Sequence, residues 1–244
     1  MPRFFVKGND ISDGRITLRD GDAFHIARSL RMAVGDNLTV CDGEGTEYSV
    51  RLTKIRDEEC ECEILSTSES SSEPKAQITL YVAYPKADKL ETVIQKAVEL
   101  GASRIVPFES SRCIKRPKAE KIDKVTARLS RIAEEAAKQC GRSKLPTVSA
   151  PIGYTAAIND AARADLALFC YEGECPMSIK DALRNAKEPK TVSVTVGAEG
   201  GFSEEEARAA TSAGLLSVTL GPRILRCETA PLYALASLSY ELEL

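Results

Sequence analysis

The feature of this sequence that most constrains its fold is an alternation of strand-like and helix-like segments over residues 73–244. The strand-like segments are largely apolar runs: ITLYVAY (78–84), RIVPF (104–108), DLALFCY (165–171), TVSVTVG (191–197) and SVTLG (217–221). Between them, apolar residues recur at helical spacing, first from Leu90 to Val98 and again from Ile122 to Ala136. Apolar strands separated by amphipathic helices are typical of a parallel sheet that is covered by helices on both faces.

Local signals predict where these two helices begin and end. Asp88 and Glu91 resemble a capping box at the start of the first helix, and Gly101 is expected to end it. Gly141 is expected to end the second helix in the same way.

Residues 1–72 follow a different pattern, in which short β runs such as RITL, NLTV and ECECEIL are separated by Gly and Asp turns. One helix is expected among them, from Asp22 to about Met32. Cys60 and Cys62 alternate within E-C-E-C-E, so both thiols are expected on the core-facing side of a strand. The net charge changes from −5 in residues 1–72 to +2 in residues 73–244, across the polar stretch STSESSSEP (66–74). The sequence therefore predicts a small β-barrel over residues 1–72, followed by an α/β domain over residues 73–244.

The composition excludes several classes of protein. With 43% hydrophobic residues and a net charge of −3 over 244 residues, the chain can bury a core, which excludes a disordered polymer. No run reaches the roughly 18 apolar residues of a membrane helix, and the N-terminus has no signal-peptide core. The 8 Cys form no C-x-x-C pair and there is a single His, so we expect reduced thiols in a cytoplasmic protein, with no metal and no membrane.

Two loops follow predicted strands, at the edge of an α/β sheet where ligands bind. The first, GAEGGFS (197–203), has three Gly in five positions, which lets the backbone approach a ligand closely; Ser203 with Glu206 predicts a capping box for the next helix. The second, LGPRILRCETA (220–230), places two Arg and one Glu among apolar residues, where burial without partners is costly. An ordinary tight turn and a solvated loop remain the alternatives, since neither loop matches G-x-G-x-x-G or a phosphate-binding P-loop.

Several segments of the chain resemble one known family. They are LETVIQKAVELGASRIVPFESSRC (90–113), QCGRSKLP (139–146), VGAEGGFSEEE (196–206), LGPRILRCETAPLYAL (220–235), RFFV (3–6) and HIARSLRMAVGD (25–36). The chain resembles the ribosomal RNA small subunit methyltransferase E family of the SPOUT superfamily, which joins a PUA-like RNA-binding domain to a methyltransferase domain. Two positions depart from the family pattern. Ala198 stands where Pro is usual, which loosens the unbound loop, and Cys227 stands where Thr is usual, which is a weaker hydrogen-bonding group.

This resemblance implies that the C-terminal segment is threaded into a SPOUT-type trefoil knot, where general topology rules favour an unknotted doubly wound sheet. It implies transfer of a methyl group from S-adenosylmethionine to N3 of a uridine in small-subunit (16S) ribosomal RNA, either free or in an assembling small ribosomal subunit. The cofactor-binding residues that it implies are Leu168, Gly197, Glu199, Gly201, Leu220, Gly221, Ile224, Leu225, Thr229 and Ala230.

The chemistry of this reaction assigns roles to residues of the two loops. Uracil N3 carries a proton at neutral pH, so catalysis must remove that proton and stabilise the negative charge that spreads onto the neighbouring oxygens. The guanidinium of Arg226 has donors that suit these oxygens, and Glu228 is expected either to orient Arg226 or to act as the base. Glu199, Glu228 and a water molecule remain open as the base, and the sulfonium leaving group needs no metal.

Basic residues predict where RNA binds. Residues 103–146 hold 12 basic and 5 acidic side chains, and a solvated basic face is the alternative to phosphate binding there. In the first domain, His25, Arg28 and Arg31 are spaced to share one helix face, which suits phosphate contacts, while a structural role for His25 stays open. The candidate RNA-binding residues are His25, Arg28, Arg31, Arg112, Lys115, Arg116, Gln139 and Arg142. The family resemblance of the QCGR segment implies that the last two meet the target nucleotide.

The C-terminal segment PLYALASLSYELEL (231–244) is apolar on nearly every helix face and is charged only at Glu241 and Glu243. Such a helix must be buried on more than one side, so we expect a homodimer that pairs through it. Three other functions remain as alternatives: an RNA-binding module that has lost catalysis, methylation of tRNA, and an oxidoreductase with a nucleotide cofactor. The missing G-x-G-x-x-G argues against the oxidoreductase.

Overall fold

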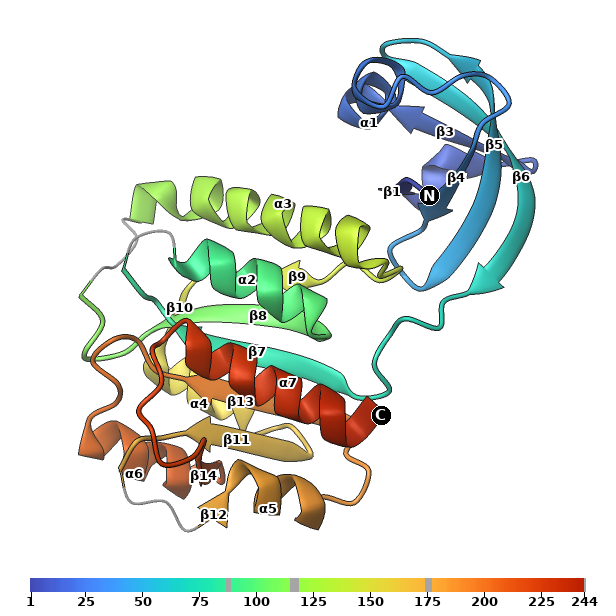
Figure 1. The fold of residues 1–244 in the computed structure, drawn as a ribbon. Coiled ribbons are helices and arrows are strands. Elements are labelled where there is room, and N and C mark those ends of the chain that lie inside the picture. The colour runs from blue at the N-terminus through green and yellow to red at the C-terminus, as the bar shows by residue number, and fades with distance from the viewer. Residues whose placement is uncertain (87–88, 115–118, 174–176, 244) are drawn as a thin grey trace. The chain divides into compact units, whose positions relative to one another are not determined.

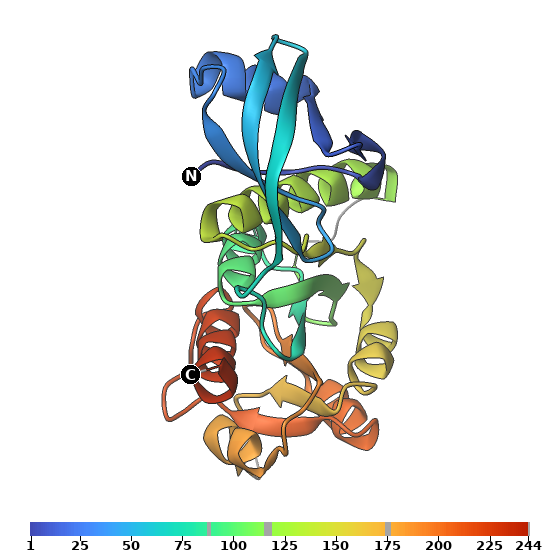
Figure 2. The ribbon, with the colours of Figure 1, turned by 90° about the vertical axis from the view of Figure 1, so that its right-hand side faces the viewer.

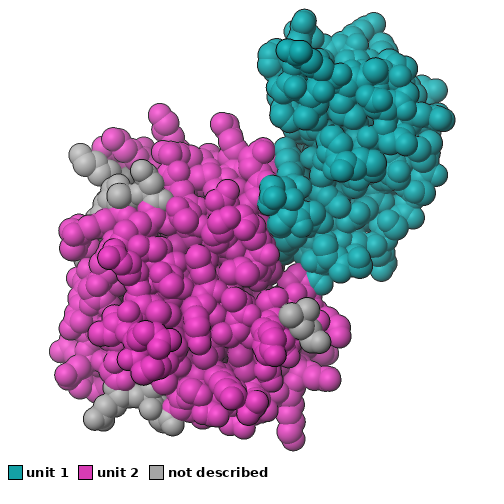
Figure 3. Space-filling view, in the orientation of Figure 1, with its two compact units in different colours: residues 1–73, 137–145 teal, residues 74–136, 146–244 magenta. Residues whose placement is uncertain are grey.

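The computed structural model describes residues 1–86, 89–114, 119–173 and 177–243 (Figure 1). The chain forms two compact units, coloured separately in Figure 3. Unit 1 comprises Met1–Glu73 and Ala137–Leu145, and unit 2 comprises Pro74–Ala136 and Pro146–Leu244. The boundary near residue 73 lies where the composition changes. The return of residues 137–145 to unit 1 has no counterpart in the domain limits expected from the sequence.

Unit 1 is a curled sheet of six strands. Its strands lie in the order β1 (Arg3–Phe5), β4 (Asn37–Cys41), β5 (Thr46–Ile55), β6 (Glu59–Glu69), β3 (Arg15–Arg19) and β2 (Ile11–Ser12). A short 3-10 turn, η1 (Gly8–Asp10), precedes β2. No pairing joins β1 to β2 among the strands that the structure describes, so this part, predicted as a small β-barrel, is a curled sheet with two open edges. Cys60 and Cys62 are fully buried in its core, which confirms the period-two interpretation.

The helical segment of unit 1 is shorter at its end than the sequence predicted. Helix α1 (Asp20–Phe24) continues directly into a single π-helical turn, η2 (His25–Ser29). Arg31 has a φ of 53°, in the left-handed region, and a right-handed helix cannot continue through that conformation. The predicted helix to Met32 is therefore wrong at this end, and Arg31 does not share a helix face with His25 and Arg28.

Unit 2 contains one parallel sheet. Its strands lie in the order β10 (Ile152–Gly153), β8 (Ala102–Glu109), β7 (Gln77–Ala83), β13 (Thr191–Val196), β11 (Leu166–Cys170), β14 (Leu216–Thr219) and β12 (Met177–Ser178), with β9 (Thr147–Val148) paired to β8. Every pair of these neighbours is parallel. The five apolar runs of the sequence are β7, β8, β11, β13 and β14, so their prediction as strands of a parallel sheet is confirmed.

Helices cover both faces of this sheet, as predicted. The helices after β7 are α2 (Lys89–Glu99), α3 (Ile122–Cys140), α4 (Tyr154–Ala161), α5 (Ile179–Asn185), α6 (Glu204–Ser212) and α7 (Thr229–Glu243), with a 3-10 turn η3 (Ala119–Lys121) before α3; α3 is not among those that cover the sheet. Helices α2, α5 and α7 lie on one face and α4 and α6 on the other, as Figures 1 and 2 both show. Within the described ranges, no helix has both the length and the apolar character needed to cross a membrane.

Most of the predicted helix ends are present. Gly101 (φ +89°) follows α2 and Gly141 (φ +82°) follows α3, both in the left-handed conformation that ends a helix. The hydroxyl of Ser203 accepts a hydrogen bond from the Glu206 N–H at 3.1 Å, and the Glu206 carboxylate accepts one from the Ser203 N–H at 2.9 Å. This confirms the capping box at the start of α6. The other predicted capping residue, Asp88, lies outside the described residues.

The strand order determines which loops meet. Strand β11 lies between β13 and β14, so the two glycine-containing loops are not on adjacent strands of the sheet. Because all three strands are parallel, their carboxyl ends lie at the same edge. The end of β11 therefore lies between the two loops, at the same edge of the sheet.

Candidate active site

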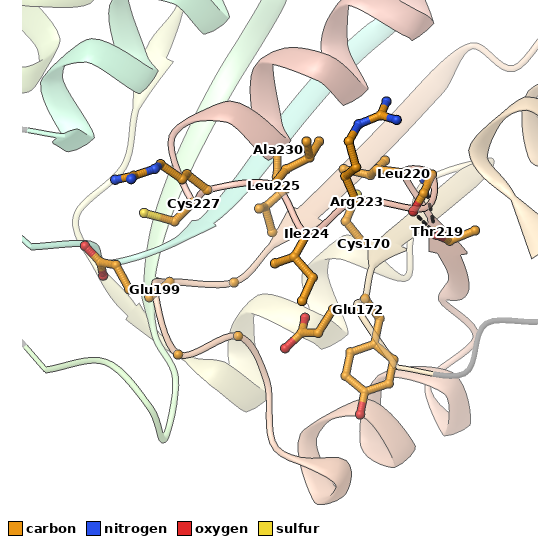
Figure 4. Close-up of a pocket in the computed structure, with 18 of the residues that line it drawn as sticks. Cys170, Glu172, Glu199, Thr219, Leu220, Arg223, Ile224, Leu225, Cys227 and Ala230 are labelled. Carbon is orange, nitrogen blue, oxygen red and sulfur yellow. Dashed lines mark hydrogen bonds between the residues drawn. The ribbon is translucent and has the colours of Figure 1, made fainter.

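A pocket of about 540 Å³ lies at the carboxyl ends of β13, β11 and β14 (Figure 4). Three loops form it, one after each strand, and α2 and α7 each contribute one residue. The lining residues are Cys170–Glu172, Val196–Gly201, Thr219–Cys227, Lys89 and Ala230. This is the edge at which parallel α/β sheets bind ligands.

The first wall of the pocket is a tight turn at residues 197–201. The Gly201 N–H donates to the Ala198 carbonyl at 2.9 Å, so the turn forms although Ala198 stands in place of the usual Pro. A Cβ on Gly197 would lie 3.1 Å from the Gly201 Cα. A Cβ on Gly201, which has a φ of +60°, would lie 1.9 Å from an oxygen of Glu172. A side chain at Gly197 would press on the Gly201 backbone, and the positive φ of Gly201 favours glycine, so the backbone of this wall lies close to the pocket.

The second wall is the loop between β14 and α7. Its turn contains Gly221 at φ +118°, and it ends where the Arg226 carbonyl accepts the N–H groups of Thr229 and Ala230 at 2.9 Å each, in the first turn of α7. Ile224 is 88% exposed and projects into the pocket (Figure 4). An exposed apolar side chain inside a pocket favours a ligand with an apolar or aromatic part.

One cation joins the two walls. The Lys89 Nζ lies 3.3 Å from Oε1 of Glu199 in the first wall and 3.1 Å from Oε2 of Glu228 at the end of the second. The Cys227 Sγ lies 3.7 Å from the same Nζ and donates to Glu228 at 3.1 Å. The Glu199 carboxylate also accepts the backbone N–H of Lys86 at 3.1 Å. Because Lys89 begins α2, the helix that follows β7 (Gln77–Ala83) in the chain, it reaches this sheet edge from a third element.

The electrostatics of this cluster keep its carboxylates charged. The hydrogen bond from the Cys227 thiol, with those from the backbone and Lys89, lowers the pKa of Glu228 to about 2. Burial and the neighbouring Glu228 raise the pKa of Cys227 to about 12. Burial alone would raise the pKa of Glu199, but hydrogen bonds from the backbone and from Lys89 lower it. Hydrogen bonding to Glu228 raises the pKa of Lys89. At neutral pH the cluster thus holds two carboxylates, an ammonium and a thiol, and Glu228 is a weak base.

Most of the residues expected at the cofactor line this pocket: Gly197, Glu199, Gly201, Leu220, Gly221, Ile224, Leu225 and Ala230. The two others lie outside its lining. Leu168 is fully buried within β11, and Thr229 is exposed on the first turn of α7. Of the expected catalytic residues, Arg226 and Glu199 line the pocket, and Glu228 reaches it through Lys89.

The sequence interpretation missed Lys89, Tyr171 and Glu172. The position of Lys89 at the start of the first helix was a usable signal, since helix starts in parallel α/β folds lie at the ligand-binding edge. Tyr171 and Glu172 directly follow β11, but only the strand order places that strand between the two walls.

The expected RNA-binding residues of unit 2 and of the QCGR segment have different environments. Arg112 is exposed and its guanidinium donates to the Gly200 carbonyl of the first wall at 2.9 Å. Lys115 and Arg116 lie outside the described residues. Gln139 is exposed in the last turn of α3. Arg142 is only 4% exposed and pairs with Glu73 at 2.8 Å within unit 1, so its guanidinium faces a buried carboxylate instead of solvent.

The three expected RNA-binding residues of the β-rich part are all exposed. The His25 ring packs edge-on against Phe4, with 6.2 Å between ring centroids. The Nε of Arg28 donates to Asp57 at 2.9 Å. Arg31 lies beyond the helix end, as described above. His25 and Arg28 are thus exposed, and each also contacts another side chain of unit 1.

Comparison with known proteins defines the class of this one. A family model described as an RNA methyltransferase domain matches residues 71–239, and one described as an RNA methyltransferase PUA domain matches residues 18–65. Ribosomal RNA small subunit methyltransferase E of Bacillus subtilis is 31% identical, covering 100% of this chain and 98% of the relative. That of Aquifex aeolicus is 33% identical over 88% of this chain and 90% of its own length.

Solved structures agree with the sequence relatives. The Neisseria gonorrhoeae ribosomal RNA small subunit methyltransferase E, bound to S-adenosylmethionine, is 35% identical with a TM-score of 0.86, covering 98% of this chain and 97% of that one. A Legionella pneumophila protein in complex with the same cofactor is 30% identical, also with a TM-score of 0.86, over 98% and 96% of the two chains.

The fold is that of an RNA methyltransferase domain, joined to a PUA domain that lies within unit 1. In the described part of the chain, no group of His, Cys, Asp and Glu side chains is arranged to hold a metal ion. The chain belongs to the ribosomal RNA small subunit methyltransferase E family.

Proposed function

We propose that this protein transfers a methyl group from S-adenosylmethionine to N3 of a uridine in small-subunit (16S) ribosomal RNA. The observation that carries the proposal is the pocket between the glycine turn 197–201 and the loop 219–227, in a chain whose relatives bear this name and hold this cofactor. The PUA domain supports RNA as the substrate. The free RNA or an assembling small subunit is then the partner, and the cytoplasm is the compartment proposed with it.

The residues of the pocket fit the cofactor. Its volume, about 540 Å³, lies within the range of small-molecule sites. The glycine wall exposes backbone groups that can bind the polar parts of the cofactor, and Ile224 offers an apolar surface to its base. The residues assigned to hold it are Gly197, Gly201, Leu220, Gly221, Ile224, Leu225 and Ala230. Leu168 and Thr229, which lie outside the lining, are not assigned to the cofactor. When bound, the cofactor supplies an electrophilic methyl group on a sulfonium leaving group.

The side chains around the pocket supply the remaining chemistry. Arg226 is exposed on the second wall, and its guanidinium is assigned to the uracil oxygens, where the charge develops as N3 loses its proton. A carboxylate with a pKa of about 2 is a poor acceptor for a uracil proton, so Glu228 is assigned to orienting Lys89, and Glu199 shares that role. The N3 proton then passes, directly or through a water molecule, to the Glu199 carboxylate.

The RNA-binding surface includes residues from several segments. His25, Arg28 and Arg31 are assigned to phosphates, and their exposure supports this. Arg112, which contacts the first wall, is assigned to phosphates, and Lys115 and Arg116 keep the same assignment from the sequence. Gln139 is assigned to the target nucleotide. Arg142, being buried, positions the backbone next to Gln139.

The trefoil knot and the homodimer belong to the same proposal. The knot is supported by the path of the chain, since β14 lies beyond β11 whereas α7 packs against β13 and α2. The dimer is supported by α7, on which Tyr233 is 45% and Tyr240 71% exposed. Light scattering at micromolar concentration checks it, with twice 26.4 kDa expected for the dimer.

Mass mapping of rRNA tests the function. Small-subunit RNA or subunits from a strain lacking the protein are incubated with the purified protein and S-adenosylmethionine, and the nucleosides are analysed. We expect one N3-methyluridine, absent when Arg226→Ala replaces the wild type. Methylation of tRNA alone would assign a different substrate. No binding of millimolar cofactor would favour an RNA-binding module without catalysis.

A further inference from the structure

Arg112 is exposed on the loop after β8, and its side chain contacts the first wall of the pocket from outside the lining. Its Nη1 donates to the Gly200 carbonyl at 2.9 Å, across 88 residues of sequence. The two backbones are close as well, since a Cβ on Gly200 would lie 3.0 Å from the Arg112 Cβ and 3.4 Å from its carbonyl oxygen. The chemistry of methyl transfer described above gives this contact no role.

The loop that carries Arg112 is itself fixed to the segment that follows the wall. The Ser111 N–H donates to Oε1 of Glu206 at 2.7 Å. The other oxygen of this carboxylate accepts the Ser203 N–H at 2.9 Å, in the capping box of α6. Glu206 and Ser110, at the start of the loop, are both buried. The Arg112 side chain therefore extends from an anchored backbone toward the turn that precedes α6.

The contact at Gly200 fixes one peptide plane of the wall. The Gly200 C=O and the Gly201 N–H belong to the same planar peptide. Arg112 binds the oxygen of this peptide, and the Ala198 carbonyl accepts its N–H at 2.9 Å. Two consecutive glycines have wide backbone freedom, so a restraint from outside the turn increases its order before a ligand binds. A turn that is ordered in advance costs less to fix when the ligand arrives.

We propose that Arg112 is a positioning residue of this pocket: its guanidinium holds the Gly200–Gly201 peptide and so orders the turn 197–201 for S-adenosylmethionine. The inference rests on the proposed function, because it takes that cofactor as the ligand of the pocket. A guanidinium has several N–H donors, so the bond to Gly200 leaves others for an RNA phosphate. The two assignments of Arg112 are therefore compatible.

Calorimetry in the absence of RNA separates the two roles, because an RNA contact alone cannot change cofactor affinity under these conditions. The probe is S-adenosylhomocysteine, added to the full-length protein. We expect Arg112→Met to weaken its binding by about threefold to tenfold, the effect of one lost hydrogen bond, and Arg112→Lys, which keeps a donor, to recover part of this loss. Arg208→Met is the matched control and should bind like the wild type, since Arg208 is exposed on α6 and pairs with Glu204 at 3.5 Å.

Hydrogen exchange of the Gly201 amide, followed by NMR on the cofactor-free protein, tests the positioning directly. We expect this amide to exchange about threefold to tenfold faster in Arg112→Met than in the wild type or in Arg208→Met. The urea unfolding midpoint of Arg112→Met should match that of the wild type, because Arg112 is an exposed residue.

Each other outcome overturns the inference in a distinct way. Unchanged affinity for S-adenosylhomocysteine in Arg112→Met, together with weaker RNA binding, would assign Arg112 to the RNA alone. A lower unfolding midpoint with faster exchange throughout unit 2 would make Arg112 a general structural residue, and a lysine variant as weak as the methionine one would exclude the bond to Gly200 as the cause. A wild type that binds neither S-adenosylmethionine nor S-adenosylhomocysteine would refute the proposed function itself, whereas the exchange of the Gly201 amide would still show whether Arg112 orders the turn.

Discussion

The buried pair of Arg142 and Glu73 gives the sharpest test of the structure against the sequence interpretation. The sequence pattern predicts Arg142 at the target nucleotide, but its side chain is 4% exposed and that of Glu73 11%. The Glu73 carboxylate accepts hydrogen bonds from Arg142 Nε at 3.2 Å and from Arg142 NH2 at 2.8 Å. It also accepts the backbone N–H groups of Ser143 and Lys144, each at 3.0 Å. This carboxylate thus attaches the end of the first β-rich segment to the loop after α3.

The expected loss in the free energy of unfolding follows from the burial of this ion pair. Removing one partner of a buried ion pair leaves the other charge uncompensated, which costs about 3–5 kcal/mol. Arg142→Met and Glu73→Gln should each lower the free energy of unfolding by about 3 kcal/mol, since Glu73→Gln keeps an oxygen for the backbone N–H groups. For a urea m-value of about 2 kcal/mol/M, the unfolding midpoint shifts by about 1.5 M. The double variant removes both charges, so it should cost clearly less than the sum of the single variants.

Urea unfolding measures these values, and hydrogen exchange of the β5 and β6 amides assigns the change to unit 1. Arg51→Met is a matched control, since Arg51 also pairs with a glutamate, Glu63, but on the exposed surface, where such pairs contribute little. RNA affinity is measured on the same proteins below their unfolding transitions. The reasoning would be refuted if Arg142→Met unfolded like the wild type and lost RNA binding, because Arg142 would then serve the RNA directly.

The other predictions concern catalysis, RNA binding and pH. Arg226→Ala should abolish methyl transfer and leave cofactor affinity by calorimetry within about tenfold, and near-normal turnover would remove Arg226 from the mechanism. Lys89→Met leaves the carboxylates of Glu199 and Glu228 without their shared cation, so kcat should fall about tenfold or more, and Lys89→Arg should recover part of it. Equal rates in the wild type, Lys89→Met and Lys89→Arg would contradict the bridging role. Arg28→Glu with Arg31→Glu should weaken RNA binding and reduce its salt dependence, and an unchanged slope of log K against log salt would exclude phosphate contacts there. Burial by itself would raise the pKa of Glu73, but the hydrogen bond from Arg142 outweighs it, so the pKa in the folded protein is lowered. The stabilisation by the charged carboxylate is therefore complete above the unfolded pKa of about 4.3 and is lost as the pH falls through the folded pKa. In acid unfolding titrations the wild type should accordingly lose its stability advantage over Glu73→Gln.

Local sequence signals predicted the parts of this protein that depend on short-range physics. The apolar runs became β7, β8, β11, β13 and β14, and the Ser203–Glu206 capping box formed, because strand period and helix caps depend on neighbouring residues. The glycine turn was predicted for the same reason: Gly201 requires a positive φ and space that a side chain would fill. The family resemblance then identified the pocket that these elements form.

Long-range packing decided the rest. The order β13, β11, β14 brings the end of β11 between the two walls, and nothing in the spacing of the strands along the sequence specifies that order. The same holds for Lys89, which lies 110 residues from Glu199 in the sequence and 139 from Glu228, yet contacts both. Arginine is a common RNA-binding residue, but Arg142 is buried and forms an ion pair with Glu73, which lies 69 residues away in the sequence. By itself, the sequence determined which segments become strands, helices and turns. The tertiary structure alone decided which charges meet, because the electrostatic partners of a side chain depend on distance in space.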